Sequence, residues 1–305
     1  MTKKVVTIGG GTGSYSVLRG LKEFPLDITA VVSTFDSGSS SGILRDEFGV
    51  LPPGDIRRCL VALSDGARAE ILRDLFNFRF ENGGGLKGHS FGNLFLVALS
   101  SIYGSEIEGI RKASELLDLK GKVLPVSLDK SELHAILENG EEIIGETNID
   151  VPKHDGTSRI KNVSLKPTAS LFEETGKAIR EADLIIIGPG DPYTSVIPNL
   201  LVRGMQEALR ESRGKKIVIT NLMSKWGETH GFCASDIVRE LLAYSGLEKF
   251  DYAVCNTAQM DAKLVAAYEK EKQFPIACDD KLSEYATKVI TGDFFSEADI
   301  ARHDS

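Results

Sequence analysis

Near its start the chain carries the stretch VVTIGGGTGSYS, residues 5–16, in which a short apolar run leads into a cluster of glycines. The run is typical of a buried strand, and the residues that follow from Ser16 to Leu21 favour a helix. Glycines let a backbone approach an anion closely, and a helix N-terminus offers free N–H groups with a partial positive charge. The stretch therefore predicts a loop that holds phosphate. Its candidate binding residues are Gly9, Gly10, Gly11, Thr12 and Gly13.

This loop fits neither of the two common nucleotide-binding templates. A Walker loop needs Gly-Lys-Ser/Thr, but Gly13 is followed by Ser14 and Tyr15. The dinucleotide pattern G-x-G-x-x-G has Ser14 at its third glycine position. Asp36, which follows the second apolar run, can be interpreted as the ribose-binding acid of an NAD site, but the residues around it favour a different ligand.

The bulk composition excludes several classes of protein. A chain of 305 residues with 42% hydrophobic and 26% charged residues is ordinary for a globular domain with a large core. A net charge of -8 argues against a nucleic-acid partner. No apolar stretch approaches the roughly 20 residues that span a bilayer. Residues 1–4 lead straight into the first strand, so we expect no signal peptide. The four cysteines form no C-x-x-C pair. We therefore expect a cytoplasmic protein with reduced thiols.

Apolar runs alternate with helical patterns along the chain. We expect strands at residues 5–8, 28–32, 184–187, 216–220 and 252–255, and helices at 16–22, 199–212 and 234–244. Such alternation predicts an α/β fold with a mostly parallel sheet covered on both faces. Between about residues 121 and 165, short alternating segments at 124–128, 133–137, 142–145 and 160–165 predict a small antiparallel β insertion. We expect one domain, 1–305, containing this insertion, whose exposed edge would suit a homodimer.

Two further segments are candidates for ligand contacts near the second strand. The run DSGSSSG, residues 36–42, can wrap phosphate or sugar hydroxyls, or it can be a solvated flexible loop. The run GVLPPGDIRR, residues 49–58, predicts a rigid turn with Asp55 as the N-cap of a helix. Arg57 or Arg58 would clamp a phosphate or lie on the surface. The candidates in the first run are Asp36, Ser37, Gly38 and Ser40.

The stretch GHSFGN, residues 88–93, matches the G-x-S-x-G nucleophile elbow with Ser90 as nucleophile. That motif needs a strand directly before it, and residues 81–87 are too rich in glycine to be a buried strand. We therefore rank a hydrolase below the other hypotheses. His89 either bridges loops near the helix start or contacts a ligand.

A second glycine loop follows the apolar run at residues 184–187. A strand, glycines, hydroxyl residues and a helix again predict an anion site, although a long turn broken by prolines would have the same sequence. Its candidates are Gly188, Pro189, Gly190, Tyr193, Thr194 and Ser195. Asn221, Lys225 and Glu228 follow a later strand and would lie at the same edge of the sheet.

Taken together, these segments resemble the CofD/YvcK-like family, and the YvcK branch more closely than the CofD branch. The stretches that carry the resemblance are GGGTGS from Gly9, FDSGSSSG from Phe35, GVLPPGDIR from Gly49, GHSFGN from Gly88, IIGPGDPYTSVIPNLLV from Ile186 and NLMSKWGETHGF from Asn221. The resemblance implies a Rossmann-like three-layer α/β/α core. The functional residues that it implies are Gly9 to Gly13, Asp36, Asp55, Asn93, Gly188 to Gly190 and Asn221.

The two branches of that family imply different functions. The YvcK branch implies a gluconeogenesis factor that binds UDP-sugars such as UDP-N-acetylglucosamine and affects carbon metabolism, cell shape and envelope synthesis. The CofD branch implies transfer of a phospholactyl-type group from a nucleotide diphosphate donor to a deazaflavin, with magnesium. The YvcK-type loop usually carries a second aspartate where this chain has Ser37. The change leaves Asp36 as the candidate magnesium ligand and weakens the expectation of a metal.

Three hypotheses about function follow. The favoured one is a nucleotide-sugar-binding regulator without turnover, because the chain has two glycine loops and no convincing nucleophile–base pair. The second is a magnesium-dependent transferase in which Asp36 holds the metal and Arg57 steadies the charge. The third is a hydrolase with Ser90 as nucleophile and His230 as base.

Overall fold

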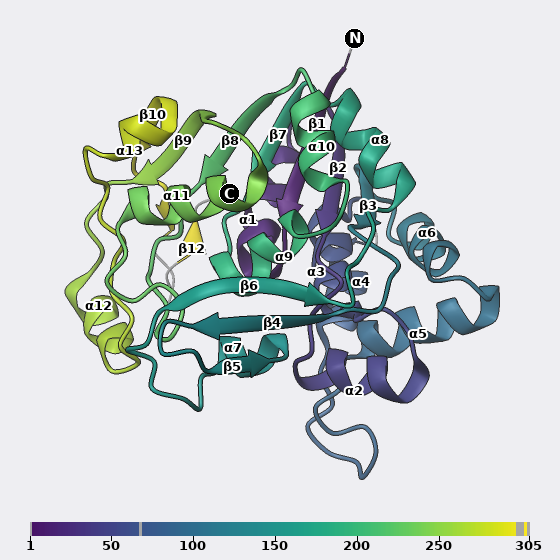
Figure 1. The fold of residues 1–305 in the computed structure, drawn as a ribbon. Coiled ribbons are helices and arrows are strands. Elements are labelled where there is room, and N and C mark those ends of the chain that lie inside the picture. Colours follow the sequence, from purple (N-terminus) through teal and green to yellow (C-terminus); the bar gives the residue numbers. More distant parts are fainter. Residues whose placement is uncertain (1, 67–68, 297–301, 304–305) are drawn as a thin grey trace.

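The computed structural model describes residues 2–66, 69–296 and 302–303, and its centre is a seven-stranded sheet (Figure 1). Every pair of neighbouring strands is parallel, in the order β10-β9-β8-β7-β1-β2-β3. The strands are β1 (Lys3–Gly9), β2 (Leu26–Val32), β3 (Lys122–Pro125), β7 (Leu184–Ile187), β8 (Lys215–Ile219), β9 (Phe250–Asn256) and β10 (Ala286–Gly292). The last five residues of both β1 and β2 are buried, as expected for strands covered on both faces.

Helices cover both faces of this sheet, so the fold is the predicted three-layer α/β/α arrangement (Figure 1). One hydrophobic cluster packs helices against β2 and β3, and a second packs other helices and the insertion against β1, β7 and β8. The first group contains α1 (Gly11–Leu21), α3 (Pro53–Leu63), α4 (Ala69–Asn77), α5 (Phe91–Tyr103) and α6 (Glu106–Leu116). The second contains α8 (Glu173–Glu181), α9 (Ile197–Leu200), α10 (Met205–Glu211), α11 (Ala234–Ser245) and the π-helical turn η1 (Pro192–Val196).

Three helices and a pair of two-residue strands lie outside these two groups and outside the insertion. They are α2 (Ser39–Phe48), α12 (Ala262–Glu269), α13 (Leu282–Tyr285) and the pair β11 (Phe295–Ser296) and β12 (Arg302–His303). None of the helices in the described part of the chain has the length and apolar character to cross a membrane.

The predicted antiparallel insertion is a three-stranded sheet with one helix. It contains β4 (Glu132–Leu137), β5 (Glu142–Ile144), α7 (Glu146–Asp150) and β6 (Ile160–Lys166), in the strand order β5-β4-β6. Alternate residues of β4, such as Leu133 and Ala135, are buried and join the second hydrophobic cluster. The first strand expected in this region, at 124–128, is not part of it, because β3 pairs in parallel with β2 and forms an edge of the main sheet.

The strand order creates a switch point between β1 and β7. From β1 the chain moves through β2 to β3, whereas from β7 it moves the other way through β8 and β9 to β10. The loops that follow β1 and β7 therefore leave the carboxyl ends of these two neighbouring strands in opposite directions. Open α/β sheets bind their ligands in the crevice at such a point, at the carboxyl edge of the strands.

Three helix predictions need correction. The helix expected from Ser16 begins earlier, at Gly11, so part of the glycine loop is itself the first helical turn. The helix expected at 199–212 is divided into α9 and α10, because Gly204 has a φ of +98° and cannot continue a helix. The run at 36–42, predicted as a loop, turns into helix α2 at Ser39.

Candidate functional site

A cleft of about 660 Å³ lies at the carboxyl edge of the sheet, above the switch point. Both glycine loops, the start of α3 and the end of α7 border it. The predicted residues that line it are Gly10, Gly11, Thr12, Gly13, Asp36, Gly38, Ser40, Asp55, Arg57, Asn93, Pro189, Gly190, Thr194, Ser195 and Asn221. Five other candidates do not line it: Gly9, Ser37, His89, Gly188 and Tyr193.

The two glycine loops touch each other across the switch point. A Cβ atom placed on Gly13 would lie 2.3 Å from the carbonyl oxygen of Pro189, so only glycine fits there. Gly11 has a φ of +68°, which glycine adopts without strain. The close approach leaves the backbone at the start of α1 exposed to the cleft, as a site for an anion requires.

Arg57 is the buried positive charge of the cleft. Its guanidinium donates to Asn93 Oδ1 at 3.1 Å, to the carbonyl oxygen of Phe76 at 3.2 Å and to Asn77 Oδ1 at 2.6 Å, all of them neutral acceptors. Among the described residues no carboxylate forms an ion pair with it. Burial, together with the neighbouring Arg58 and Arg79, lowers the pKa of Arg57 to about 10. The neighbouring Asp55 favours the charge of Arg57, but its ion pair is with Arg58. A buried cation without an ion pair of its own is a favourable place for an anionic ligand.

The sequence analysis predicted that Asp55 caps helix α3, and this prediction is wrong. The helix begins at Pro53, with Pro52 in the capping position, because a proline suits the first helical turn. Asp55 is instead inside the first turn, where its carboxylate pairs with Arg58 at 3.2 Å and accepts a hydrogen bond from the backbone of Gly11. Burial raises the pKa of Asp55. The side chain therefore ties α3 to the first glycine loop.

His89 and Ser90 do not line the cleft but contact residues that do. His89 Nδ1 lies 3.0 Å from Ser40 Oγ, and Asn93 Nδ2 donates to the same hydroxyl at 3.1 Å. Ser90 caps α5, since its hydroxyl accepts the backbone N–H of Asn93 at 3.3 Å. No strand precedes Ser90 within the described residues 69–89, which rules out the nucleophile-elbow geometry. The side chains of this group orient Asn93 and, through it, Arg57.

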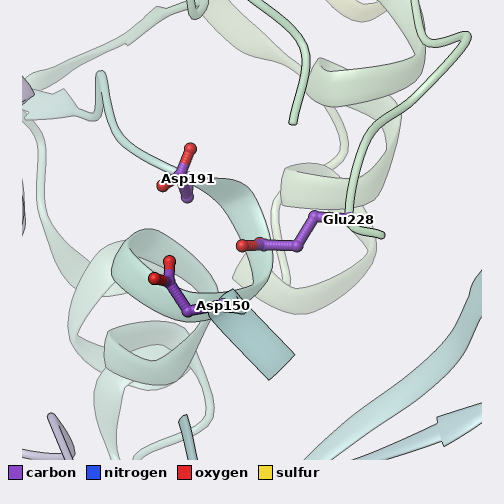
Figure 2. A group of neighbouring side chains, drawn as sticks. All are labelled: Asp150, Asp191 and Glu228. Atoms are coloured by element: carbon purple, nitrogen blue, oxygen red, sulfur yellow. The ribbon is translucent and has the colours of Figure 1, made fainter. Parts of the chain in front are cut away.

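On the opposite side of the cleft three carboxylates lie close together (Figure 2). They belong to Asp150 of the insertion, to Asp191 of the second glycine loop and to Glu228. The Lys225 ammonium pairs with Asp150, with Asp191 at 2.8 Å and with Glu228 at 3.8 Å. Burial disfavours that charge, but the carboxylates outweigh it and raise the pKa of Lys225. The ammonium occupies the position that a metal would take, so this cluster acts as a clamp between insertion and core.

Glu228 also fixes the turn that follows the second glycine loop. Its carboxylate accepts the backbone N–H of Tyr193 at 3.1 Å and the hydroxyl of Thr194 at 3.0 Å. This explains why Tyr193, a predicted ligand contact, is buried instead of lining the cleft.

Comparison with known proteins identifies the family. A family model described as 2-phospho-L-lactate transferase CofD matches residues 5–295. The chain belongs to the CofD family. The gluconeogenesis factor of Halalkalibacterium halodurans is 44% identical over 99% of this chain and 93% of its own length. That of Bacillus subtilis is 41% identical over 99% and 94%. These relatives place the chain in the YvcK branch.

The fold of a solved relative agrees. The crystal structure of a Bacillus halodurans protein superimposes with a TM-score of 0.94 at 43% identity, covering 100% of this chain and 97% of that one. The chain therefore shares its fold with this solved relative.

The departure of this family member at Ser37 has a structural counterpart. The hydroxyl of Ser37 accepts the backbone N–H of Thr147 at 3.0 Å, and its backbone N–H donates to Glu146 at 3.3 Å. Burial and the neighbouring Asp36 and Asp150 raise the pKa of Glu146 to about 8. Ser37 thus joins the β2 loop to the insertion instead of facing the cleft.

Sequence reasoning missed the contribution of the insertion. Glu146 and Asp150 line the cleft, yet the segment ETNID carries no pattern that distinguishes it from a surface turn. Its position below the second glycine loop arises only from the tertiary fold.

Proposed function

We propose that the chain is a nucleotide-sugar-binding regulatory protein, a gluconeogenesis factor like its named relatives. The observation that carries this proposal is the buried Arg57, which forms no ion pair with a carboxylate among the described residues and borders a cleft with two glycine loops. A diphosphate would accept hydrogen bonds from the backbone at the start of α1 and from this guanidinium. A cleft of about 660 Å³ is within the usual range for such ligands.

The ligand we favour is a UDP-sugar such as UDP-N-acetylglucosamine. That choice rests on the resemblance to the YvcK branch and on the many hydroxyl, amide and carboxylate groups of the cleft, which suit a sugar. The regulatory role in carbon metabolism and cell shape rests on the same resemblance. The use of Ser90 as a helix cap supports binding without covalent catalysis.

The alternative is a transferase of the kind for which the family model is described. Asp36 and Asp55 line the same cleft, and their carboxylate oxygens are the ligands that Mg²⁺ prefers. A bound Mg²⁺ would neutralise charge on a nucleotide diphosphate donor. Arg57 would hold the diphosphate in place, and the glycine loops would exclude water from it.

Two further parts of the proposal concern the cell and the assembly. The four cysteines are free thiols, which fits a cytoplasmic protein. The homodimer stays a prediction, to be checked by light scattering.

Thermal unfolding in the presence of ligands tests the proposed function. UDP-N-acetylglucosamine, UDP-glucose, GDP, GTP and NAD are compared with and without Mg²⁺, and each ligand is then analysed chromatographically for turnover. A ligand at about 100 times its dissociation constant adds about 2.7 kcal/mol to the free energy of unfolding. We expect stabilisation by UDP-sugars, which remain intact. Mg²⁺-dependent consumption of a guanine nucleotide would favour the transferase, and stabilisation by none of the five would contradict both.

A further inference from the structure

Helices α4 and α5 form a hairpin that packs on the core with one side only. Residues 78–90 join the two helices, and the backbone N–H of Phe91 donates to the carbonyl of Phe78 at 2.8 Å, which holds the ends of this connection together. The ring centres of Phe76 on α4 and Phe95 on α5 lie 5.3 Å apart. Phe76 is fully buried, so the inner sides of the two helices pack against each other and against the core.

The outer side of α4 carries a second row of apolar side chains. Ile71, Leu75 and Phe78 follow one another at spacings of four and three residues, which places them on one helical face. Their exposed fractions are 73%, 42% and 52%. The outer face of a surface helix normally carries charged and polar residues, whereas this row is apolar.

Helix α5 has the composition of a buried helix. None of its thirteen residues is charged. Phe91, Phe95, Ala98 and Ile102 follow one another at spacings of four, three and four residues. The rings of Phe91 and Phe95 stack with their centres 5.8 Å apart and are partly exposed, Ala98 is exposed, and Ile102 is 72% exposed. Both helices therefore show to solvent the spacing with which helices pack side by side in bundles.

Together these seven side chains form what we call the α4–α5 face. A large apolar side chain covers about 150–250 Å² when fully exposed, so the face presents roughly 600 Å² of apolar surface. The largest apolar patch on a typical monomer is about 300–600 Å², and each partner in a standard interface buries about 800 Å². The face is thus large enough to form most of one side of a stable interface.

Charged side chains begin at the rim of this face. Glu70, Arg73 and Asp74 lie beside the apolar row of α4, and the row itself holds no charge that would select a partner of opposite charge. An apolar centre with a charged rim is the usual arrangement of a specific protein interface.

We propose that the α4–α5 face binds a second copy of this chain, so that two hairpins pack as a four-helix bundle about a two-fold axis. A two-fold interface joins the same patch on both subunits, and an uncharged face with helical spacing is complementary to another of its kind. The inference goes beyond the proposed function because it does not depend on the ligand. It assigns the predicted homodimer to a surface that the sequence analysis did not consider.

The edge of the insertion, where the sequence analysis placed the homodimer, is less suited to pairing. The edge strand β5 has only three residues, and Glu142 at its start is engaged by Lys166 at 2.7 Å. Short edge strands with charged side chains are a common protection against pairing with another chain. Figure 1 shows α5 at the periphery of the molecule, away from β5, so the two surfaces can be tested separately.

Gel filtration with light scattering on the full chain tests the proposal. The variants Ile71→Glu and Ile102→Glu each put a charge into the centre of the face, and Ile144→Glu puts the same charge on β5 as the matched control. We expect the wild type and Ile144→Glu to show twice the chain mass of 33.1 kDa. The two face variants should weaken dimerisation at least about 100-fold and show the mass of one chain, because the two-fold axis brings like charges together.

Two checks accompany this measurement. Ile71 and Ile102 are 73% and 72% exposed, so both variants should keep the wild-type far-ultraviolet circular dichroism. The urea midpoint of the wild type should rise with protein concentration, and that of the face variants should not.

Three results would overturn the proposal. The first is a wild type that stays monomeric at about 100 μM, because interfaces of standard size bind with micromolar or tighter affinity. The second is a dimer that survives both changes on the face, and the third is a dimer that Ile144→Glu dissociates. The first result removes the homodimer altogether, and the other two leave a homodimer formed by another surface. The proposed ligand binding is measured separately and is affected by none of them.

Discussion

Replacing Arg57 by glutamine separates the cost of burying its charge from the benefit of binding an anion. In the ligand-free protein the guanidinium donates only to neutral acceptors on Asn93, Phe76 and Asn77. Each such hydrogen bond contributes about 1 kcal/mol net, and the loss of some of them is offset by relief of the buried charge. We therefore expect Arg57→Gln to change the free energy of unfolding of the ligand-free protein by about 1 kcal/mol or less.

The effect on ligand binding should be much larger. A hydrogen bond to a charged group contributes about 1.5 to 3 kcal/mol, which corresponds to an affinity loss of about 10- to 150-fold. At a concentration of 100 times the wild-type dissociation constant, the ligand stabilises the wild type by about 2.7 kcal/mol. A variant that binds 100-fold more weakly would be stabilised by only about 0.4 kcal/mol.

Calorimetric titration with UDP-N-acetylglucosamine and urea unfolding with and without ligand measure both quantities. The matched control is Arg210→Gln, which removes an exposed arginine on α10 that pairs with Glu207 at 3.4 Å. Arg210→Gln should bind like the wild type. The reasoning is refuted if Arg57→Gln keeps wild-type affinity, or if it unfolds several kcal/mol more easily without ligand, since Arg57 would then be a structural residue.

Three other substitutions test neighbouring parts of the site. Gly13→Ala places a Cβ 2.3 Å from the carbonyl oxygen of Pro189, so we expect a loss of about 1–3 kcal/mol in urea unfolding and weaker ligand binding. Gly84→Ala, where a Cβ meets no described atom within 4 Å, is the control, and equal stability of the two would contradict the contact. Lys225→Met leaves three carboxylates without their ammonium, and should lower the free energy of unfolding by about 3 kcal/mol near neutral pH. The loss should be smaller in acid, because the carboxylates take up protons there. A loss of stability that does not depend on pH would disprove the clamp. Glu146 has a folded pKa of about 8, above its ordinary 4.5, so the wild type loses stability as the pH rises through that interval. Glu146→Gln, unfolded with urea in the presence of a chelator, should be more stable than the wild type at about pH 9 and similar at about pH 4, and the reverse order would disagree with the burial of this carboxyl.

Five strands of the main sheet could be predicted because each contains a continuous apolar run, whereas β10, with the sequence ATKVITG, was not predicted. The run LIII at Leu184–Ile187 has the predicted bounds, and the others differ by a residue or two at each end. Parallel strands buried on both faces leave this pattern in the sequence whatever the tertiary context. The β3 strand was assigned to the wrong sheet, because four residues that pair with β2 look the same as a strand of the insertion.

The parts of the site that directly follow a strand could be predicted, and the parts that other segments contribute could not. The glycine loops after β1 and β7 stand at strand ends, so their meeting follows from the sheet topology. Glu146, Asp150 and Tyr268 come from the insertion and from α12, and their place in the cleft depends on contacts between segments that are 50 or more residues apart in sequence. Ser37 was expected at the ligand, but its side chain bonds to Thr147. For His89 two alternatives were open, and its contact with Ser40 agrees with a residue that bridges loops near the helix start.

A crystal structure of the protein with UDP-N-acetylglucosamine tests the central claim most directly. The account predicts the diphosphate at the switch point, within hydrogen-bonding distance of the backbone of residues 10–13 and of the Arg57 guanidinium. A diphosphate bound beside Lys225 instead, or a nucleotide bound outside the cleft, would contradict it.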